Sequence, residues 1–532
     1  MEKKHQMRKL LIPAALLPGI FFDILFWEKI PGISFPIFVL LCTTIGFFII
    51  KTENLYPAKE NFLLLIPIVF LSIMTFIRKE PFTSFLNYSL TLIFMAVLAM
   101  TYLSSQWVSF GLSDYAVNFF HLIGGMFTLP WLSSANNKDS QQKDHGVKTW
   151  IKSAKPVIRG VLLAVPVLLV FTALFSSADM IFAERVNFII TNLKLVNLPE
   201  YLLRGLIILI IAYFFTGIIL YAAKRSNNTR LLGIDKPIVA SFLGFTETSI
   251  ILGGVLLLFS AFVLIQFEYF FFGQANITLQ GFTYSEYARR GFGELVAVAV
   301  FSIMLIKGLS VISKRETSRK IKVFTVLTIC LVTLVLIILV SAFQRLYLYE
   351  SAYGFSRLRT YAHVFMIWLG ILLLAVVIME VFRRQRIFTN IVLAILFGFI
   401  FSLNLLNVDG FIVEKNINRS VQGEVLDISY LSTLSNDAIP ELVSNFSSGK
   451  LSSRIQEDIG ATLICFQQSM RSTLDSQKYW QSFHLSNWIA KRDLQKVQQE
   501  LSGYQVQDKD WPTIVTSPDG GEYPCQSFSE FD

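Results

Sequence analysis

The sequence predicts an all-α fold, a polytopic bundle of transmembrane helices followed by a small, mainly helical C-terminal domain outside the cytoplasm. The 532 residues are 54% hydrophobic and 16% charged, with a mean hydropathy of +0.56. Nearly charge-free stretches such as 249–267, 323–343 and 387–407 recur along the chain. Each has the roughly 20 residues that a helix needs to cross a hydrocarbon core about 30 Å thick. From residue 409 onward the pattern changes, with 10 Lys/Arg against 17 Asp/Glu.

About eleven spans meet the length and hydropathy of a crossing helix. They lie at 9–27, 34–50, 61–77, 83–103, 157–176, 201–222, 245–266, 291–311, 322–343, 360–381 and 387–407. With the N-terminus inside, the cytoplasmic segments carry about 24 Lys/Arg and the opposite loops about 11, which favours an inner N-terminus and an outer C-terminus. The basic start precedes no small-residue cleavage site, so we expect the first span to be retained.

Residues 107–131 are apolar enough for a further span, yet they contain Asp114, Asn118 and His121. A crossing there would move the Lys-rich loop at 138–155 outside or invert the N-terminus, so we predict an interfacial helix. The expected domains follow. They are the N-terminal spans with the interfacial helix (1–131), a basic cytoplasmic loop (132–156), the main bundle (157–407) and the outer C-terminal domain (408–532).

Apolar spacing in the C-terminal domain predicts helices at 451–474 and 487–501, the second with Ser486 as its N-cap. Residues 508–521 are typical of turn and loop. Cys465 and Cys525 also lie in this domain. Outside the cytoplasm they could pair, closing a loop of about 60 residues and stabilising the domain by about 4 kcal/mol. The alternative is two free thiols.

Charged residues near the hydrocarbon boundary are candidates for function because their burial is costly. The candidate ligand-binding residues on the outer side are Arg289, Arg290, Glu294, Arg345, Glu350, Tyr353, Arg357 and Arg359, and a second polar group contains Asp179, Glu184 and Arg185. Guanidinium groups bind phosphate and carboxylate in a bidentate manner, so the first group predicts a site for an anionic lipid or solute. The alternative is ordinary ion pairs and snorkelling side chains at helix ends.

Recognisable enzyme motifs are missing from the sequence. The five histidines are scattered, and there is no Walker A loop, Gly-x-Ser-x-Gly elbow or zinc-ligand spacing. We therefore expect no metal site, no cofactor and no catalytic residue, and an enzyme is disfavoured. The positive charge belongs to loops next to the membrane, so we expect no nucleic-acid partner.

Several short motifs resemble a known group of membrane proteins. They are Ser176–Asp179, Glu286–Phe292, Tyr353–Arg359, Asn416–Arg419, Leu426–Leu431 and Asn436–Pro440. Over residues 160–445 the chain is similar to the bacterial family of unknown function DUF4153/4173. The resemblance implies a multi-pass protein of the bacterial cytoplasmic membrane, and it implies no activity, cofactor or catalytic residue.

Three functions remain open at this point. The first is a sensory, regulatory or assembly component of the cell envelope, whose C-terminal domain contacts an envelope protein. The second is a transporter or lipid-handling protein that binds an anionic group at the outer Arg cluster. The third is a membrane-embedded transferase. In each case the lipid bilayer is the main surrounding partner.

Overall fold

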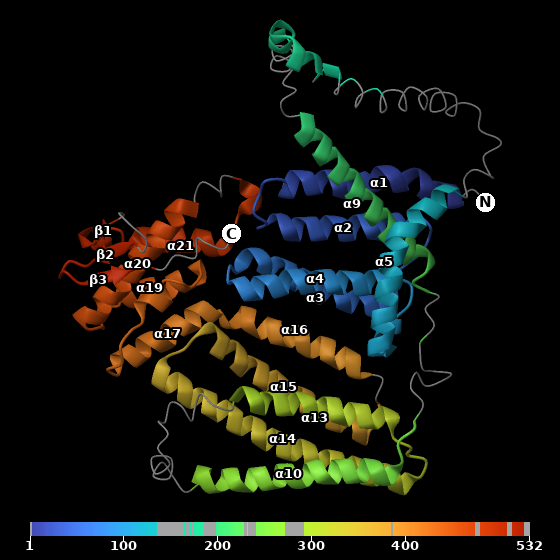
Figure 1. Ribbon diagram of the computed structural model, residues 1–532, viewed down its shortest axis with the longest axis vertical. Coiled ribbons are helices and arrows are strands. Elements are labelled where there is room, and N and C mark those ends of the chain that lie inside the picture. Colours follow the sequence, from blue (N-terminus) through green and yellow to red (C-terminus); the bar gives the residue numbers. More distant parts are fainter. Residues whose placement is uncertain are drawn as a thin grey trace. The chain divides into compact units, whose positions relative to one another are not determined.

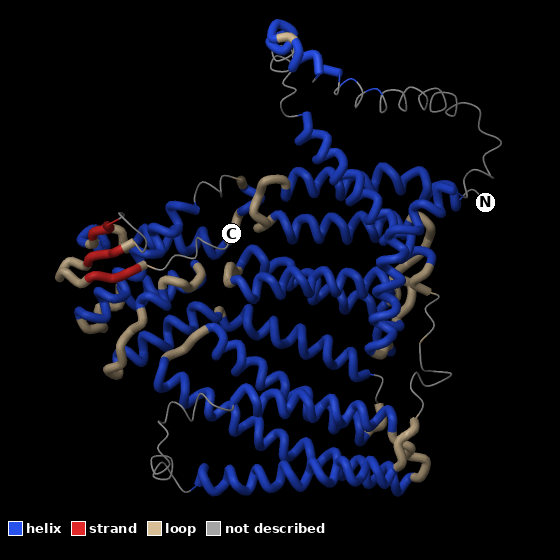
Figure 2. Tube along the Cα trace, in the orientation of Figure 1, coloured by secondary structure: helices blue, strands red, loops and turns tan. Residues whose placement is uncertain are grey.

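The computed structural model describes residues 3–135, 198–227, 241–271, 292–384, 387–473, 479–507 and 513–525, together with parts of 164–185 and residue 231. Helices dominate these residues, and the strands are confined to one short sheet (Figures 1 and 2). Nine helices in this part of the chain are long and apolar enough to cross a membrane. They are Ser34–Lys51, Lys59–Ile77, Pro81–Met100, Leu198–Lys224, Phe245–Gln266, Gly293–Ile312, Ser318–Tyr353, Arg357–Val381 and Phe388–Leu406.

The prediction of a helical, multi-pass membrane protein is thereby confirmed, whereas the number and orientation of the spans stay predictions. Most of the expected span at 157–176 lies outside the described residues. The expected first span lies in α1 (Lys3–Phe26), whose apolar part, Pro13–Phe26, is shorter than the nine crossing helices. Residues 112–135 form helix α5 (Leu112–Ala135), which is not among the nine.

The first of two compact units contains residues 1–27, 41–56 and 120–225. In it, α1 packs along α9 (Leu198–Lys224). Gly19 permits this approach, because a Cβ atom there would lie 2.4 Å from the carbonyl oxygen of Ile208. Arg204 binds both carboxylate oxygens of Asp23, at 2.8 and 2.6 Å. The acidic group late in α1 is therefore neutralised within the unit.

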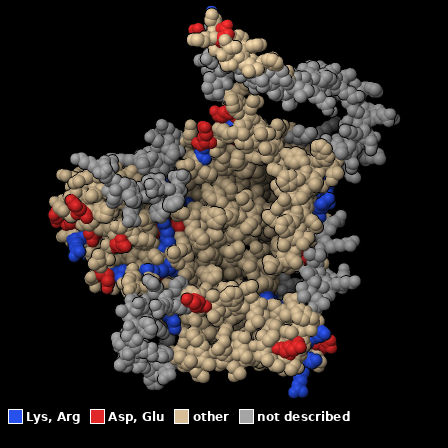
Figure 3. All heavy atoms as spheres, viewed as in Figure 1, with Lys and Arg blue, Asp and Glu red and all other residues tan. Residues whose placement is uncertain are grey.

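The second unit contains residues 28–40, 57–119 and 226–532. Its membrane helices share an apolar core that α10, α13, α14 and α15 enclose. The contacts continue from α15 to α16, and from α16 to the pair α3 and α4 (Figure 1). The bounds are α3 Phe62–Ile77, α4 Pro81–Met100, α10 Phe245–Phe271, α13 Phe292–Ile312, α14 Ser318–Tyr353, α15 Arg357–Val381 and α16 Phe388–Leu406. On the face that Figure 3 shows, the middle of the surface is largely uncharged, and most of the charged side chains gather towards its edges.

The C-terminal domain belongs to the second unit and has its own apolar core. Its helices are α17 Val408–Val421, α18 Ile428–Leu431, α19 Ile439–Phe446, α20 Ser453–Thr473 and α21 Leu485–Lys496. The strands β1 Gln505–Gln507, β2 Ile514–Thr516 and β3 Glu522–Pro524 form an antiparallel sheet in the order β1-β2-β3. Two residues of the membrane helices, Tyr361 of α15 and Leu403 of α16, are part of this core. The domain is therefore packed onto the ends of these spans.

Two sequence predictions for this domain need correction. Residues 508–521 were expected to be turn and loop, but β2 lies within them, because Val515 of β2 is fully buried against the domain core. The second helix begins at Leu485 after His484, not after Ser486. The helix at 451–474 is confirmed as α20.

Three loops between membrane helices contact the C-terminal domain. The loop before α2 (Ser34–Lys51) reaches it through Ile33, whose N–H donates to the carbonyl oxygen of Phe483 at 3.0 Å. The loop before α4 reaches it through Lys79, whose N–H donates to Asp437 at 2.8 Å. The loop before α15 does so through Phe355. The predicted alternation of loops places all three on the side of the C-terminal domain, and this sidedness stays a prediction.

Cys465 of α20 and Cys525 after β3 form a disulfide, with 5.4 Å between their Cα atoms. The bond closes a loop with a sequence separation of 60 residues. Replacing both cysteines by Ala should lower the stability of the domain by about 4 kcal/mol, since the unfolded chain regains the entropy of that loop. Hydrogen exchange of the purified full chain should then be faster in α20 and β3. A matched variant, Cys42→Ala with Cys330→Ala, removes the two free cysteines; equal exchange in the two variants would contradict this role.

His484 should make stability depend on pH. Burial, together with the charge of Lys79, lowers the pKa of His484 from 6.5 to about 4. The folded protein therefore holds a neutral imidazole, and its contribution is complete above pH 6.5 and is lost as the pH falls towards 4, by up to about 3 kcal/mol. The unfolding midpoint of His484→Gln should fall less between pH 7 and pH 4.5 than that of the wild type. An exposed control, His121→Gln, should behave as wild type; the same fall in all three proteins would contradict the prediction.

Candidate functional site

The turn between α14 and α15 positions the first residues of the candidate site. α14 ends at Gly354, whose φ of +84° is a backbone conformation that favours glycine. A Cβ atom at this position would also lie 2.8 Å from the side chains of Asn416 and Arg419. Glycine is therefore required both for the turn and for the close approach of α17.

Helix α17 holds this turn in place from the C-terminal domain. The amide of Asn416 accepts from the N–H of Phe355 at 2.8 Å and donates to the carbonyl oxygen of the same residue at 3.0 Å. Arg419 donates to the carbonyl oxygens of Ser351 and Ala352, at 3.1 and 3.0 Å. These contacts satisfy carbonyl groups at the end of α14, which a helix leaves without partners.

An ion pair at the start of α15 joins the membrane helices to the C-terminal domain. Arg357 donates from Nε and Nη2 to the two carboxylate oxygens of Asp409, at 2.8 and 2.6 Å. Asp409 is fully buried and also accepts from the N–H of Ser435 at 2.7 Å. It lies in the first turn of α17, just after Asn407, whose left-handed φ of +50° turns the chain from α16 into α17. Asn is among the few residues that adopt this conformation readily.

Glu80 lies beside this pair, at the N-terminus of α4. Its carboxylate accepts from the N–H groups of Phe82 and Thr83, at 3.0 and 2.7 Å, and thus caps the helix. It also accepts a hydrogen bond from the hydroxyl of Tyr361 and lies 3.9 Å from Arg357. A buried carboxylate at a helix N-terminus is stabilised by the helix dipole as well as by these donors.

Asp437 completes the cluster from the C-terminal domain. One of its oxygens accepts from the N–H groups of Lys79 and Glu80, at 2.8 and 3.1 Å, and the other lies 3.9 Å from Arg78. Burial raises the pKa of Asp437, although the hydrogen bond from Lys79 and the charge of Arg78 oppose the shift. The residue thus fixes the loop between α3 and α4 to the domain.

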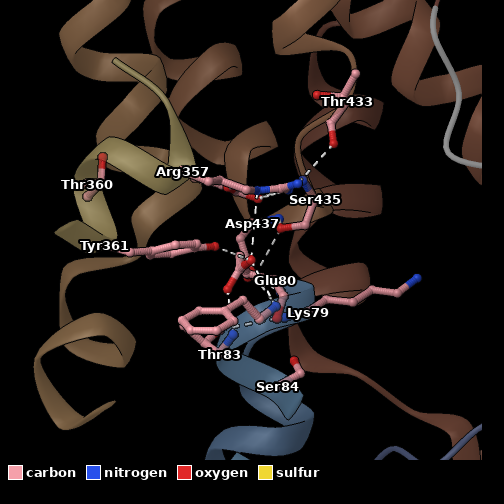
Figure 4. A network of polar contacts seen from close by, with 12 residues as sticks. Lys79, Glu80, Thr83, Ser84, Arg357, Thr360, Tyr361, Thr433, Ser435 and Asp437 are labelled. Atoms are coloured by element: carbon pink, nitrogen blue, oxygen red, sulfur yellow. Dashed lines mark hydrogen bonds and ion pairs between the residues drawn. The ribbon is translucent and has the colours of Figure 1, made fainter. Parts of the chain in front are cut away.

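Glu80, Arg357, Tyr361, Asp409 and Asp437 are called the buried charge network below (Figure 4). Its members come from α15, from the start of α4 and from two segments of the C-terminal domain. Figure 4 shows the polar groups of Glu80, Arg357, Tyr361 and Asp437 converging. The three carboxylates are at most 5% exposed, and each accepts hydrogen bonds within the network or from adjacent backbone. The arrangement is suited to holding these elements together.

The predicted ligand-binding residues divide into separate environments. Arg289 and Arg290 lie outside the described residues, and Glu294 is exposed on α13. Arg357 enters the buried charge network, whereas Arg359 stacks over Tyr349 at 4.2 Å and donates to the carbonyl oxygens of Tyr353 and Gly354. Because Arg357 and Arg359 are two residues apart on a helix, their guanidinium groups point to different sides.

The remaining predicted residues lie on α14 and near residue 180. Arg345 is partly buried, Tyr353 is exposed and Glu350 is buried. In the second predicted group, Asp179 accepts from the N–H groups of Ile181 and Phe182, and it is exposed like Glu184 and Arg185. Whether any of these residues binds a ligand stays a prediction.

Glu350 forms a second buried polar contact, with His363 of α15. The Nδ1 atom of His363 lies 3.1 Å from one carboxylate oxygen of Glu350, which is 1% exposed. The other oxygen of Glu350 and the Nε2 atom of His363 have no hydrogen-bond partner among the described residues. An acidic group and a histidine in this setting are typical of proton-binding sites in membrane proteins.

Sequence reasoning missed Glu80, Asp409 and Asp437. Two signals were present. Glu80 directly precedes Pro81, and an acidic residue before proline at the start of a helix is a capping pattern. Asp409 lies within three residues of the end of the last span. A charged side chain so close to the hydrocarbon needs an opposite charge or hydrogen bonds. No sequence signal pairs Asp409 with Arg357, which is 52 residues away.

The network should contribute strongly to stability. Arg357→Met leaves Asp409 buried without its counter-charge, which should cost about 3–5 kcal/mol. The double variant Arg357→Met/Asp409→Leu should recover most of this loss, because an apolar pair of similar volume replaces both charges. Thermal unfolding of the purified variants measures both the loss of stability and its recovery. Arg359→Met is the matched control, with a cost of at most about 1 kcal/mol; equal losses in the two single Arg variants would refute the prediction.

Comparison with known proteins identifies the family of this chain and points to no activity. No curated protein and no solved structure matches the chain. One family, described as "Domain of unknown function (DUF4153)", matches residues 65–445. Among the described helices, that range contains most of α3 and all of α4, α5, α9, α10 and α13 to α17, and with them every member of the buried charge network. The match covers well over half of the chain, and the protein belongs to the DUF4153 family of multi-pass membrane proteins.

Proposed function

We propose that this protein is a regulatory or assembly component of a cell envelope, in which the C-terminal domain and the membrane helices act as one mechanical unit. The buried charge network carries this proposal. A domain attached only through the last span would need no contact with α4 or α15. Here the domain supplies Asp409 to the start of α15 and Asp437 to the start of α4.

The network is suited to a relay because its geometry is specific. The pair of Arg357 and Asp409 is bidentate, so a small rotation of α17 breaks two charge-assisted hydrogen bonds at once. Breaking a buried pair costs several kcal/mol, which makes intermediate positions unfavourable. An element with two discrete positions is what transmits a binding event between sites.

The apolar core supports the same coupling. Tyr361 of α15 and Leu403 of α16 pack among residues of the C-terminal domain such as Ile412 and Leu442. Protein interiors are close-packed and transmit displacements instead of absorbing them. A partner that binds the domain would therefore move the ends of α15 and α16 as well. The net charge of −7 from residue 409 onward favours a partner with a basic surface.

Transport is the second candidate, and a specific observation favours it. Glu350 and His363 form a buried pair at facing positions of α14 and α15, and each retains a polar atom without a hydrogen-bond partner among the described residues. Such a pair can take up and release a proton. In a transporter, Glu350 and His363 would couple the movement of a proton to the movement of a solute.

In-cell photo-crosslinking from the C-terminal domain tests the proposal. A benzophenone amino acid replaces Val425, which is 79% exposed between α17 and α18. It is introduced into the wild type, into Arg357→Met/Asp409→Leu and into the control Arg359→Met. We expect a discrete protein adduct in the wild type and in the control, and a changed adduct pattern in the double variant, because the domain has lost its fixed position on α15.

Two outcomes would contradict the proposal. Identical adducts in all three proteins would show that the network does not govern partner binding. No protein adduct in any of them, together with a proton flux in proteoliposomes that Glu350→Gln abolishes, would favour transport. Membrane insertion of each variant is checked first by its yield in the membrane fraction.

A further inference from the structure

Part of the C-terminal domain exposes aromatic rings next to a membrane boundary. Tyr479, Trp480, Phe483 and Trp488 are 50%, 59%, 38% and 51% exposed, although large aromatic rings are usually buried. They lie in the segment that leads into α21 and in its first turn. Together they are called the aromatic edge below.

The position of the aromatic edge relative to the membrane helices is fixed by backbone contacts. The carbonyl oxygen of Phe483 accepts from the N–H of Ile33 at 3.0 Å. Ile33 immediately precedes α2, one of the helices that can cross a membrane. A Cβ atom at Gly32 would lie 2.5 Å from the same carbonyl oxygen, so the two segments touch along their backbones.

This backbone contact determines how deep the aromatic rings lie relative to the bilayer. The end of a crossing helix lies at the boundary between hydrocarbon and headgroups. A segment within one hydrogen bond of that end lies at headgroup depth, since α21 also packs against α3. Tryptophan, tyrosine and phenylalanine are favoured at this depth, where an apolar ring contacts lipid and the surroundings remain partly aqueous.

Charge around the aromatic edge fits a bilayer surface. Lys29 lies over the ring of Tyr479 at 5.4 Å, and Arg492 lies over the ring of Trp488 at 5.2 Å. α21 carries the three basic residues Lys491, Arg492 and Lys496 against one acidic residue, Asp493. Basic side chains beside interfacial rings attract anionic headgroups, by about 1 kcal/mol each.

We propose that the aromatic edge inserts into the headgroup region of the bilayer that the protein's own helices cross, with a preference for anionic lipids. The domain is then held by three sets of contacts, namely the buried charge network, the loop before α2 and the lipid surface. The lipid composition of that leaflet thereby acts on the C-terminal domain directly.

Spin labelling in liposomes tests the proposal. Cys42 and Cys330 are replaced by Ala, the disulfide is kept, and a nitroxide is attached at Trp480→Cys or, as a control, at Gln505→Cys. Gln505 is exposed on β1, and Figure 1 places the sheet on the side of the domain away from α3 and α4. Collision rates with oxygen, which partitions into lipid, and with a water-soluble nickel chelate are measured.

The expected result is a severalfold higher ratio of oxygen to nickel collisions at 480 than at 505. The ratio at 480 should rise further when phosphatidylglycerol is added to phosphatidylcholine liposomes, and Lys491→Gln/Arg492→Gln should remove this rise. Gly32→Val, which separates the backbones at the contact, should lower the ratio at 480. Equal ratios at 480 and 505 in both liposomes would overturn the proposal and leave the edge as a water-facing surface for a protein.

Discussion

A charge at the end of a membrane helix is stable only when an opposite charge and hydrogen bonds replace the water it has lost. At the start of α15, Asp409 supplies both to Arg357 through two hydrogen bonds shorter than 3 Å. Asp409 can do so only because Asn407 turns the chain directly from α16 into α17. The placement of α17 against the start of α15 therefore depends on this pair.

The other contacts of the domain follow from the same placement. Once α17 lies against the turn between α14 and α15, Asn416 and Arg419 reach the carbonyl groups at the end of α14. Asp437 then comes within reach of the backbone at Lys79 and caps the loop before α4. Asn416 and Asp437 would otherwise be buried polar groups without a partner, which costs about 1–3 kcal/mol each. The network is therefore cooperative.

Four of the six motifs that suggested the family meet at this place. The stretch Tyr353–Arg359 supplies Arg357, Asn416–Arg419 supplies the caps of α14, and Leu426–Leu431 supplies Tyr430, whose hydroxyl accepts from the N–H of Arg357 at 2.9 Å. Asn436–Pro440 supplies Asp437. Tyr353–Arg359 lies where α15 begins and the other three segments belong to the C-terminal domain, so together they connect the domain to the membrane helices. Contacts of this kind fix the position of the domain on the membrane helices, which is why we infer regulation or assembly in preference to catalysis.

Hydropathy and length by themselves determined that this chain is a helical, multi-pass membrane protein, because the bilayer imposes those requirements on every span. They also marked Arg357 as a residue of interest. Only the tertiary structure decided that Arg357 faces Asp409, and that Glu80 and Asp437 complete the cluster. The sequence could not reveal this, since the choice of partner for a charge depends on how distant helix ends meet, and local patterns carry no information on that contact.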